Sequence, residues 1–378
     1  MSISKACNGL TYATPHILNF NLAMRITMSQ FYPLQLTRIE RDTPDSVVLT
    51  LVPQEEHRAL FHHMPGQHII LRTFLAGEEL RRSYSLCNSP DKPLQVAIKK
   101  IEGGRFSHWA NTHLKTGITL EALPPMGSFG LPVEPKGARH YAGFAAGSGI
   151  TPILSMVQSV LRSEPRSRFT LVYGNRNVAT MQLREMLAGL KDLYPSRLSL
   201  IYLFSGEEQE IDLFNGRLDT ERCAELLKRY LPADTIDYAF ICGPDGMMRD
   251  VMRALIQHGV VRARIRTESY GSRASTFRPQ KKSELFGMVG VKAVIDNAQY
   301  QVELSETSEN LLDALLQAGV TPRYSCKAGV CAACRCRVLE GEVEMEEPHA
   351  LAPEEVASGY VLCCRSRPLT SRLSLLFD

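Results

Sequence analysis

Residues 325–334 read Ser-Cys-Lys-Ala-Gly-Val-Cys-Ala-Ala-Cys, so four and then two residues separate Cys326, Cys331 and Cys334. Cysteine thiolates with this spacing hold a [2Fe–2S] cluster when a fourth cysteine completes the site. The residues between them are small, which lets the backbone wrap round a cluster and direct N–H groups at its sulfurs. This stretch predicts a protein that moves electrons.

A fourth ligand is available from Cys363 and Cys364, which follow a predicted short strand at 360–362. Neighbouring residues of a strand point to opposite faces, so one of the two should reach the cluster. Disulfide frameworks belong mainly to small secreted proteins, and this long chain offers no clear secretory leader. We expect the unused cysteine and Cys336 to be small buried hydrophobic residues.

Length and composition set the broad class. The chain has 378 residues, of which 44% are hydrophobic and 22% charged, as in a soluble protein of two or three domains. A net charge of +3 is too small to indicate nucleic-acid binding, and no run of 18 apolar residues predicts a membrane span. We therefore expect a cytoplasmic protein. Residues 1–30 show no periodic pattern and are predicted to be a disordered extension.

Three modules follow, which makes the predicted fold class multidomain. Residues 31–135 contain short alternating runs, typical of an antiparallel β-barrel. In residues 136–271, apolar strands predicted at 140–146, 169–173, 198–204 and 238–242 alternate with amphipathic stretches, which predicts an α/β domain with a parallel sheet. Residues 272–285 have little apolar periodicity and are predicted to be a linker. Residues 286–378 combine strands, one helix and the cysteine loop, a pattern of an α+β, β-grasp domain.

The barrel carries a candidate flavin site at Arg82-Ser83-Tyr84-Ser85. Tyr84 can stack on an isoalloxazine, Ser85 can hydrogen-bond its N5 edge, and Arg82 can bind a pyrophosphate. Residues 103–107, Gly-Gly-Arg-Phe-Ser, are predicted to open a helix, where Gly103, Gly104 and Ser107 would hold that pyrophosphate. The first motif resembles the R-x-Y-S/T motif of ferredoxin-NADP reductase-like flavoproteins. The resemblance implies FAD and leaves FMN as an alternative.

The second module carries a candidate nicotinamide site. Residues 147–152, Gly-Ser-Gly-Ile-Thr-Pro, lie where a predicted strand gives way to a helix, the context of a dinucleotide-binding loop. Its candidate ligands are Gly147, Gly149, Thr151 and Pro152. Arg176 follows the next predicted strand, where an acidic residue would otherwise hold an NAD ribose. This favours NADPH over NADH.

Two further segments resemble motifs of the same reductase family. Cys242, Gly243 and Pro244 match a C-G-P-x-x-M motif, in which the cysteine lies beside the nicotinamide ring. Glu268-Ser269-Tyr270 matches a family ending in which the aromatic residue covers the flavin and the acid lies close to it. The resemblance implies that Tyr84, Ser85, Cys242, Glu268 and Tyr270 line the reaction centre.

The order of the three modules resembles the reductase components of bacterial multicomponent oxygenases. Their plant-type ferredoxin domains place 29 residues between the third and fourth cluster ligands, as between Cys334 and Cys364, which implies Cys364 as the fourth ligand. The implied activity is hydride transfer from NADPH to FAD, followed by single-electron transfer to the cluster and on to a di-iron oxygenase. The alternatives are a reductase for another oxygenase, such as one acting on aromatic rings, and a cluster-based redox sensor.

One charged stretch matches no cofactor motif. Residues 338–364 contain seven glutamates and no lysine or arginine. An acidic surface beside a cluster would attract a basic docking face on a redox partner. We therefore expect the oxygenase to dock here.

Overall fold

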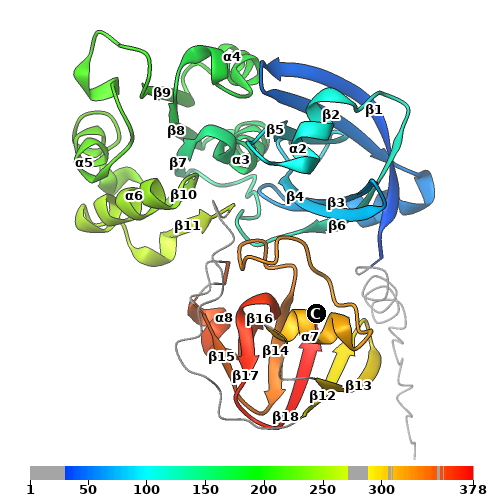
Figure 1. The fold of residues 1–378 in the computed structure, drawn as a ribbon. Helices are drawn as coiled ribbons and strands as arrows, with labels where there is room; N and C mark the ends of the chain where they lie inside the picture. Colours follow the sequence, from blue (N-terminus) through cyan, green and yellow to red (C-terminus); the bar gives the residue numbers. More distant parts are fainter. Residues whose placement is uncertain are drawn as a thin grey trace, which may run out of the picture.

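The structure of the protein is a computed structural model. It describes residues 30–270, 288–304, 308, 310–346, 350–351 and 353–377. Of the predicted N-terminal extension, only Gln30 falls within these residues, and the predicted linker at 272–285 lies outside them. No helix in the described ranges is long and apolar enough to cross a membrane. Figure 1 shows three modules, with the first two side by side and the third packed beneath the first.

The first module is an antiparallel sheet of six strands in the order β4-β3-β6-β1-β2-β5. Its elements are β1 (Tyr32–Thr43), β2 (Ser46–Pro53), β3 (His68–Leu75), β4 (Glu78–Ser85), β5 (Leu94–Lys99), α2 (Arg105–Thr112) and β6 (Thr119–Met126). Alternate apolar residues such as Val47, Leu49 and Leu51 point into its core. The edge strands β4 and β5 meet at a bridge between Leu86 and Val96, so the sheet curls into a barrel that stays open along most of this seam.

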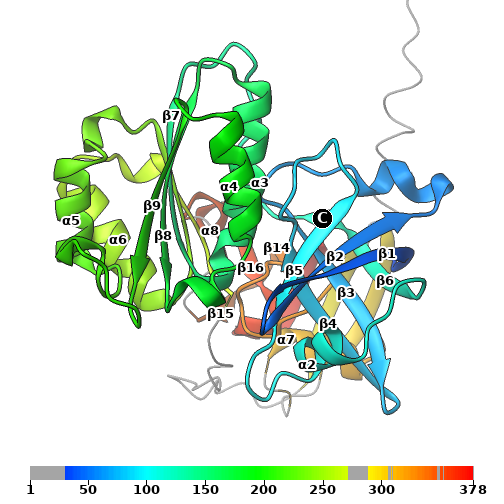
Figure 2. The same ribbon diagram turned by 90° about the horizontal axis from the view of Figure 1, so that it is seen from above.

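The second module is a parallel sheet in the order β11-β10-β7-β8-β9. Its strands are β7 (His140–Ala146), β8 (Arg168–Asn175), β9 (Leu198–Phe204), β10 (Tyr238–Cys242) and β11 (Ile265–Glu268). Its helices are α3 (Ile150–Ser163), α4 (Arg184–Leu193), α5 (Thr220–Arg229) and α6 (Asp245–Gln257). Helices α3 and α4 cover one face, and α5 and α6 the other (Figure 2). The strand order reverses between β7 and β10, where ligands bind in sheets of this kind.

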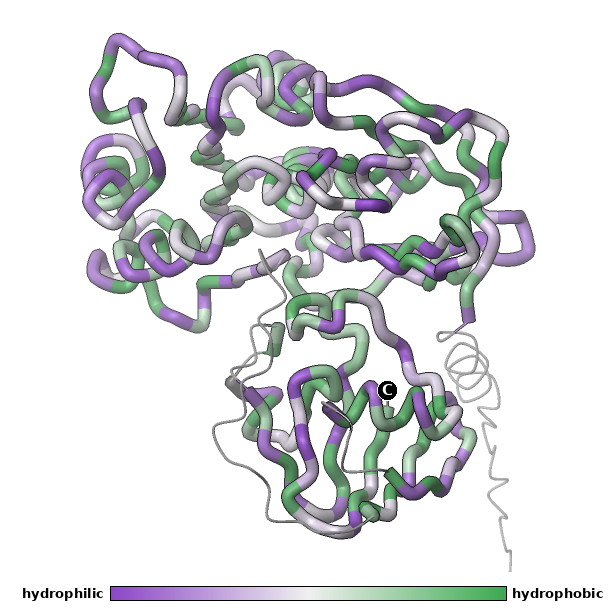
Figure 3. Tube along the Cα trace, viewed as in Figure 1, coloured by the Kyte–Doolittle hydropathy of each residue, from purple (hydrophilic) through white to green (hydrophobic). Residues whose placement is uncertain are grey.

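The third module is a mixed sheet in the order β13-β12-β18-β14-β16, with helix α7 against it and a small sheet of β15 and β17 at its side. The elements are β12 (Val289–Ile295), β13 (Ala298–Leu304), α7 (Leu311–Gln317), β14 (Arg335–Glu340), β15 (Val343–Met345), α8 (Pro353–Ala357), β16 (Tyr360–Leu362), β17 (Ser366–Pro368) and β18 (Arg372–Phe377). In Figure 3, hydrophobic and hydrophilic residues intermix along these elements, as expected when one side of each faces the core.

Gly341 turns the chain between β14 and β15 with a φ of +85°. One local prediction in this module was wrong. Cys363 and Cys364 do not continue the strand at 360–362, since residues 363–365 form a 3-10 turn. The strand-face argument for choosing between the two cysteines therefore does not apply.

Candidate functional site

The carboxyl ends of β4 and β11 and the first turn of α3 bring four polar side chains together. The Ser85 hydroxyl donates to Oε2 of Glu268 at 3.1 Å. The Tyr270 hydroxyl lies 2.9 Å from Ser85 Oγ and 3.0 Å from Thr151 Oγ1. Because these residues come from the barrel and from the nicotinamide module, the site forms only where the two modules pack together.

Glu268 is enclosed at this junction, and its burial raises the pKa of its carboxyl from 4.5 to about 7. Its Oε1 lies 3.9 Å from Nδ1 of His68, whose own pKa burial lowers to about 4. A neutral imidazole therefore faces a carboxyl group that titrates near neutral pH. Sequence reasoning missed His68, although it begins β3 and pairs in register with Ser85 of the flavin motif.

The glycine loop after β7 is shaped by close backbone contacts. Gly147 has a φ of +53°, which glycine tolerates best. A Cβ on Gly149 would lie 2.1 Å from the carbonyl oxygen of Cys242, so only glycine fits where the ends of β7 and β10 converge. Thr151 and Pro152 stand in the first turn of α3, and the Thr151 hydroxyl also donates to the Ser148 carbonyl at 3.0 Å.

Cys242 ends β10 and is fully buried. Desolvation holds the pKa of its thiol well above the ordinary value, so the side chain is neutral. A Cβ on Gly243 would lie 2.8 Å from the flexible end of the Met247 side chain and 3.2 Å from the backbone nitrogen of Ala146, and Pro244 precedes the first residue of α6. These residues lie at the carboxyl end of β10, beside the point where the strand order reverses.

The open seam of the barrel carries the other predicted flavin residues. Arg82 is exposed on β4, and the ring of Tyr84 lies 5.6 Å from that of Phe106 in α2. Gly103 has a φ of +70°, and a Cβ on Gly104 would lie 2.4 Å from Ser107 Oγ. The Ser107 hydroxyl accepts from the Ile101 N–H at 3.2 Å and donates to the Gly104 carbonyl at 3.1 Å, which fixes the loop before α2.

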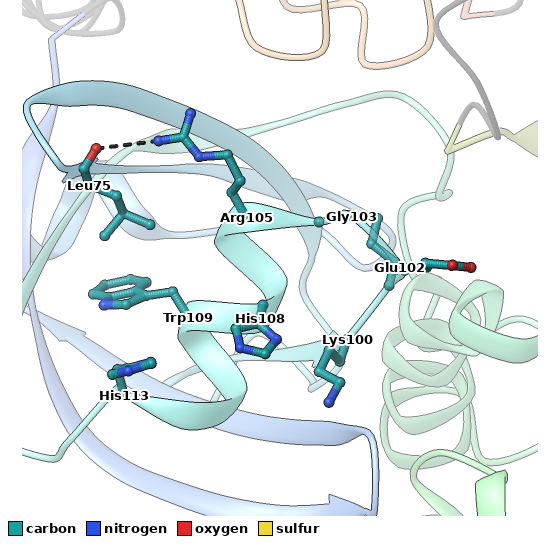
Figure 4. Close-up of a pocket in the computed structure, with 10 residues that line it drawn as sticks. Leu75, Lys100, Glu102, Gly103, Arg105, His108, Trp109 and His113 are labelled. Atoms are coloured by element: carbon teal, nitrogen blue, oxygen red, sulfur yellow. Dashed lines mark hydrogen bonds between the residues drawn. The ribbon is translucent and has the colours of Figure 1, made fainter.

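A pocket of about 810 Å³ opens beside this loop. Its walls come from the end of β3, the loop after β5, helix α2 and the residue that follows the helix (Figure 4). The ten lining residues are Leu75, Lys100, Ile101, Glu102, Gly103, Gly104, Arg105, His108, Trp109 and His113. The pocket combines an indole and aliphatic side chains with the cations of Lys100 and Arg105, a composition suited to a nucleotide.

Arg176 lies directly after β8 and is exposed. The backbone of Gly206 packs against it, with the Gly206 N–H donating to the Arg176 carbonyl at 2.8 Å. The next residue, Glu207, accepts from the Val178 N–H at 2.9 Å. Sequence reasoning found no acidic residue after β8, whereas the structure brings one from the loop after β9.

The cysteine loop contains several residues in the left-handed backbone region. Lys327, Gly329 and Ala332 take positive φ values of 53°, 75° and 52°, so the backbone winds tightly between the cysteines. The Ala328 N–H donates to Cys326 Sγ at 3.3 Å. Hydrogen bonds from Cys331 and from backbone N–H groups lower the pKa of the Cys326 thiol, which favours the thiolate that binds iron.

The four candidate ligands form two pairs, with the thiol of Cys326 hydrogen-bonded to Cys331 and that of Cys334 to Cys364. In the described part of the chain, no three His, Cys, Asp or Glu side chains are gathered for a single metal ion. Two pairs suit a two-iron cluster, because each iron takes two of the four cysteines. Cys363 faces away from them, with its sulfur 3.2 Å from that of Cys336. Both of these thiols are fully buried.

The cluster loop packs against the outer side of the barrel. Cys331 and Ala333 form an apolar group with Ile70 of β3 and Leu123 of β6, and Cys326 borders it. Residues directly opposite in an antiparallel pair share a face, so Ile70 shares its face with Ser83. Their neighbours Ile69 and Tyr84 share the other face, that of the barrel core and the flavin motif. One layer of sheet therefore separates Tyr84 from the cluster loop, whereas Ser83 of the same motif lies on the side of that loop.

The predicted acidic docking surface is partly neutralised. Arg365 pairs with Glu346, and Arg335 pairs with Glu355 at 2.6 Å. Arg335 precedes residues 338–364 and Arg365 directly follows them, so the charge count for that stretch includes neither arginine. Among the described glutamates of this stretch, Glu340, Glu342 and Glu354 are exposed. The surface is mixed in charge instead of uniformly acidic.

In comparisons with known proteins, each of the three modules matches a family of its own. Family models match an oxidoreductase FAD-binding domain at residues 33–130, an oxidoreductase NAD-binding domain at 144–253 and a 2Fe-2S iron-sulfur cluster binding domain at 294–369. A component of the 1,2-phenylacetyl-CoA epoxidase of Escherichia coli (strain K12) is 41% identical over 355 residues, which cover 93% of this chain and 99% of the relative. The chain belongs to the FAD- and [2Fe–2S]-containing reductases of oxygenase systems.

Other reductases of this family show the same extent of match. The ferredoxin reductase component of 3-ketosteroid-9-alpha-monooxygenase from Rhodococcus rhodochrous is 32% identical, over 91% of this chain and 96% of the relative. In structure, phthalate dioxygenase reductase aligns with a TM-score of 0.56 at 21% identity, over 92% of this chain and 98% of that one. This likeness extends to all three modules of the fold.

The predicted fold class and enzyme class are confirmed. The protein is an NAD(P)H-dependent flavin and iron–sulfur oxidoreductase with FAD, nicotinamide and [2Fe–2S] domains. Within such a reductase, the cofactors supply hydride acceptance and single-electron transfer, and the protein positions them. The arrangement of its own residues decides which cofactor lies where.

Proposed function

We propose that this reductase takes electrons from NADPH and passes them through FAD and a [2Fe–2S] cluster to the di-iron oxygenase of a phenylacetyl-CoA epoxidase. The observation that carries the proposal is the packing of the cluster loop on Ile70, with Tyr84 of the flavin motif on the opposite side of the same β3–β4 ribbon. The near full-length match to the Escherichia coli epoxidase component supports this choice of oxygenase.

The flavin ring would lie against Tyr84, with Ser85 at its N5 edge. Glu268 and Tyr270 would approach from the nicotinamide module, as their hydrogen bonds to Ser85 support. The pyrophosphate would bind Arg82 and the loop of Gly103 and Gly104, which Ser107 shapes. The 810 Å³ pocket beside this loop has room for an adenosine, which supports FAD over FMN.

NADPH would enter the crevice between β7 and β10. Its pyrophosphate would meet Gly147, Gly149 and the first turn of α3 at Thr151 and Pro152. Its nicotinamide would lie beside Cys242, Gly243 and Pro244, next to the flavin. The exposed guanidinium of Arg176 would hold the 2′-phosphate, a bidentate interaction that arginine makes well.

Cys326 and Cys331 would bind one iron of the cluster, and Cys334 and Cys364 the other. This assignment is supported by the two thiol pairs and by the Ala328 N–H aimed at Cys326. The mutual contact of Cys336 and Cys363 leaves both outside the ligand set. We also propose a cytoplasmic location, where a reducing environment keeps such thiols free for iron.

Reconstitution tests the function directly. The purified reductase is mixed with the oxygenase component of a phenylacetyl-CoA epoxidase, phenylacetyl-CoA, oxygen and NADPH, and epoxide is measured against NADPH consumed. Coupled epoxide formation supports the proposal. Reduction of ferricyanide without any epoxide, while the matching Escherichia coli component supports epoxide with the same oxygenase, would assign the chain to another oxygenase. Reduction of the cluster once, without multiple turnover, would favour the redox sensor.

A further inference from the structure

A stack of alternating cations and aromatic rings joins the barrel to the ferredoxin module. The Arg72 guanidinium lies 4.0 Å from the centre of the Phe31 ring, and that of Arg81 lies 4.9 Å from the same ring. Arg81 also lies 4.1 Å from the ring of Tyr324, which has Lys327 Nζ at 5.4 Å. Arg81 is the member that contacts a ring from each module.

Acidic residues compensate the charges of the stack. Arg72 makes two hydrogen bonds to Glu121, at 3.0 and 2.9 Å, within the barrel. At the other end, Lys327 pairs with Asp313 of α7 at 2.8 Å. Arg81 pairs with Glu79, and its side chain is only 10% exposed. A planar guanidinium can contact rings on two sides and still keep an ion pair, and exclusion of water strengthens each of these contacts.

The stack meets the cluster loop at its first ligand. Tyr324 and Lys327 lie on either side of Cys326 in the sequence. Between them, Ser325 accepts a hydrogen bond from the Ser83 hydroxyl at 3.1 Å. Ser83 stands between Arg82 and Tyr84 of the flavin motif, so the strand that would hold the flavin directly contacts the loop that would hold the cluster.

We propose that Arg81 is a positioning residue, which docks the cluster loop on the barrel and so sets the rate of electron transfer from FAD to the cluster. In this step, FAD that NAD(P)H has reduced is oxidised by one electron, and one ferric ion of the cluster becomes ferrous. No bond to the protein forms or breaks. The rate depends on the separation of the two cofactors, because electron transfer through protein slows steeply with distance. This inference rests on the cofactor sites proposed above and is independent of which oxygenase accepts the electrons.

The test is anaerobic stopped-flow mixing of the Arg81→Gln variant with NADPH. Flavin bleaching should keep its wild-type rate, since the Arg81 side chain contacts neither proposed nucleotide site. Arg82 donates at 2.7 Å to the Arg81 backbone carbonyl, which the substitution leaves in place. Reduction of the cluster should be slower by roughly tenfold, the effect expected for a desolvated cation–π contact. Arg81→Lys, which keeps the charge, should fall between. Small-angle X-ray scattering of the oxidised protein, a measurement independent of activity, should show a larger radius of gyration for Arg81→Gln.

The chain offers a matched control in Arg38, which also pairs with a glutamate two residues away on a strand but is 66% exposed. Arg38→Gln should leave both rates and the scattering unchanged. Tyr324→Leu should reproduce the defect from the other module, and Tyr324→Phe should not. Wild-type cluster reduction in an Arg81→Gln protein that holds FAD and cluster would overturn the inference. If Arg81→Gln loses a cofactor, Tyr324→Leu decides in the same way. If NADPH fails to reduce the cluster even in the wild-type protein, that result contradicts the proposed function and not the role of Arg81.

Discussion

Oγ of Ser85 and Oε2 of Glu268 lie 3.1 Å apart, although 183 positions separate them in the sequence. Ser85 ends strand β4 of the barrel, and Glu268 ends strand β11 of the nicotinamide module. A flavin bound at Ser85 would therefore face a carboxyl group from the module that brings the hydride. The contact explains why neither module would form the reaction centre alone.

The raised pKa of Glu268 predicts a pH-dependent stability. Its carboxyl titrates at about 7 in the folded protein against 4.5 ordinarily, so between these pH values the folded chain keeps a proton that the unfolded chain has lost. The contribution of Glu268 to stability therefore falls as pH rises from about 4.5 to 7. Glu268→Gln removes this dependence. The melting temperature of the variant minus that of the wild type should therefore increase as pH rises from 5 to 8. A constant difference across that range would refute the assigned burial.

Gly149 is predicted to tolerate no side chain. A Cβ there would lie 2.1 Å from the Cys242 carbonyl oxygen, so Gly149→Ala must separate the ends of β7 and β10. We expect a KM for NADPH that is raised at least tenfold, or loss of folded protein. Gly189→Ala is the control, because Gly189 is exposed in α4 and nothing lies within 4 Å of a Cβ placed on it. Alanine there should stabilise the helix by about 0.5–1 kcal/mol. Wild-type nicotinamide kinetics in Gly149→Ala would contradict the described loop.

Arg176 and Glu207 should set the choice of nicotinamide cofactor in opposite directions. Arg176→Ala should lower kcat/KM for NADPH roughly ten- to hundredfold, with a smaller effect on NADH. This corresponds to a loss of about 1.5–3 kcal/mol in transition-state stabilisation. Glu207→Gln should raise the preference for NADPH, because a carboxylate close to the 2′-phosphate repels it. The measurement is kcat/KM for both cofactors in all three proteins. Equal loss with NADPH and NADH in Arg176→Ala would show that the phosphate binds elsewhere.

The adjacent cysteines should differ in their effect on the cluster. Cys364→Ser should abolish the visible absorption of the cluster, since Cys364 faces Cys334. Cys363→Ser should keep most of it, because Cys363 contacts Cys336 instead. Iron content and the visible spectrum of the purified variants measure this. Equal loss in the two variants would mean that the sequence spacing and the observed pairing both misidentify the ligand.

Much of the fold could be predicted from the sequence because the strands of the nicotinamide module are short apolar runs with sharp ends. The predicted strands 140–146, 198–204 and 238–242 match β7, β9 and β10 at every boundary. The turn at 363–365 could not be predicted in this way, because no residue in its sequence marks the end of the preceding strand, β16. Its backbone is decided by packing against Cys334 and Cys336.

The candidate site was predictable only where a motif is continuous in the sequence. The glycine loop and the cysteine loop are of this kind. The contact of His68 with Glu268 joins two strands, and that of Glu207 with Val178 joins the segments that follow two strands, so no sequence period marks either pair. The Arg81 stack is likewise invisible in the sequence, because it depends on how two modules pack.

The proposed electron path runs from NADPH through FAD to the cluster. It is tested most directly by rapid anaerobic mixing of the intact protein with NADPH, followed by flavin absorbance and by the paramagnetic signal of the reduced cluster. A protein lacking residues 286–378 serves as the control. Flavin bleaching should occur in both proteins. In the intact protein, the cluster signal should appear after the bleaching and within one turnover. A cluster that stays oxidised while the flavin cycles, or that is reduced by NADPH in flavin-free protein, would contradict the account.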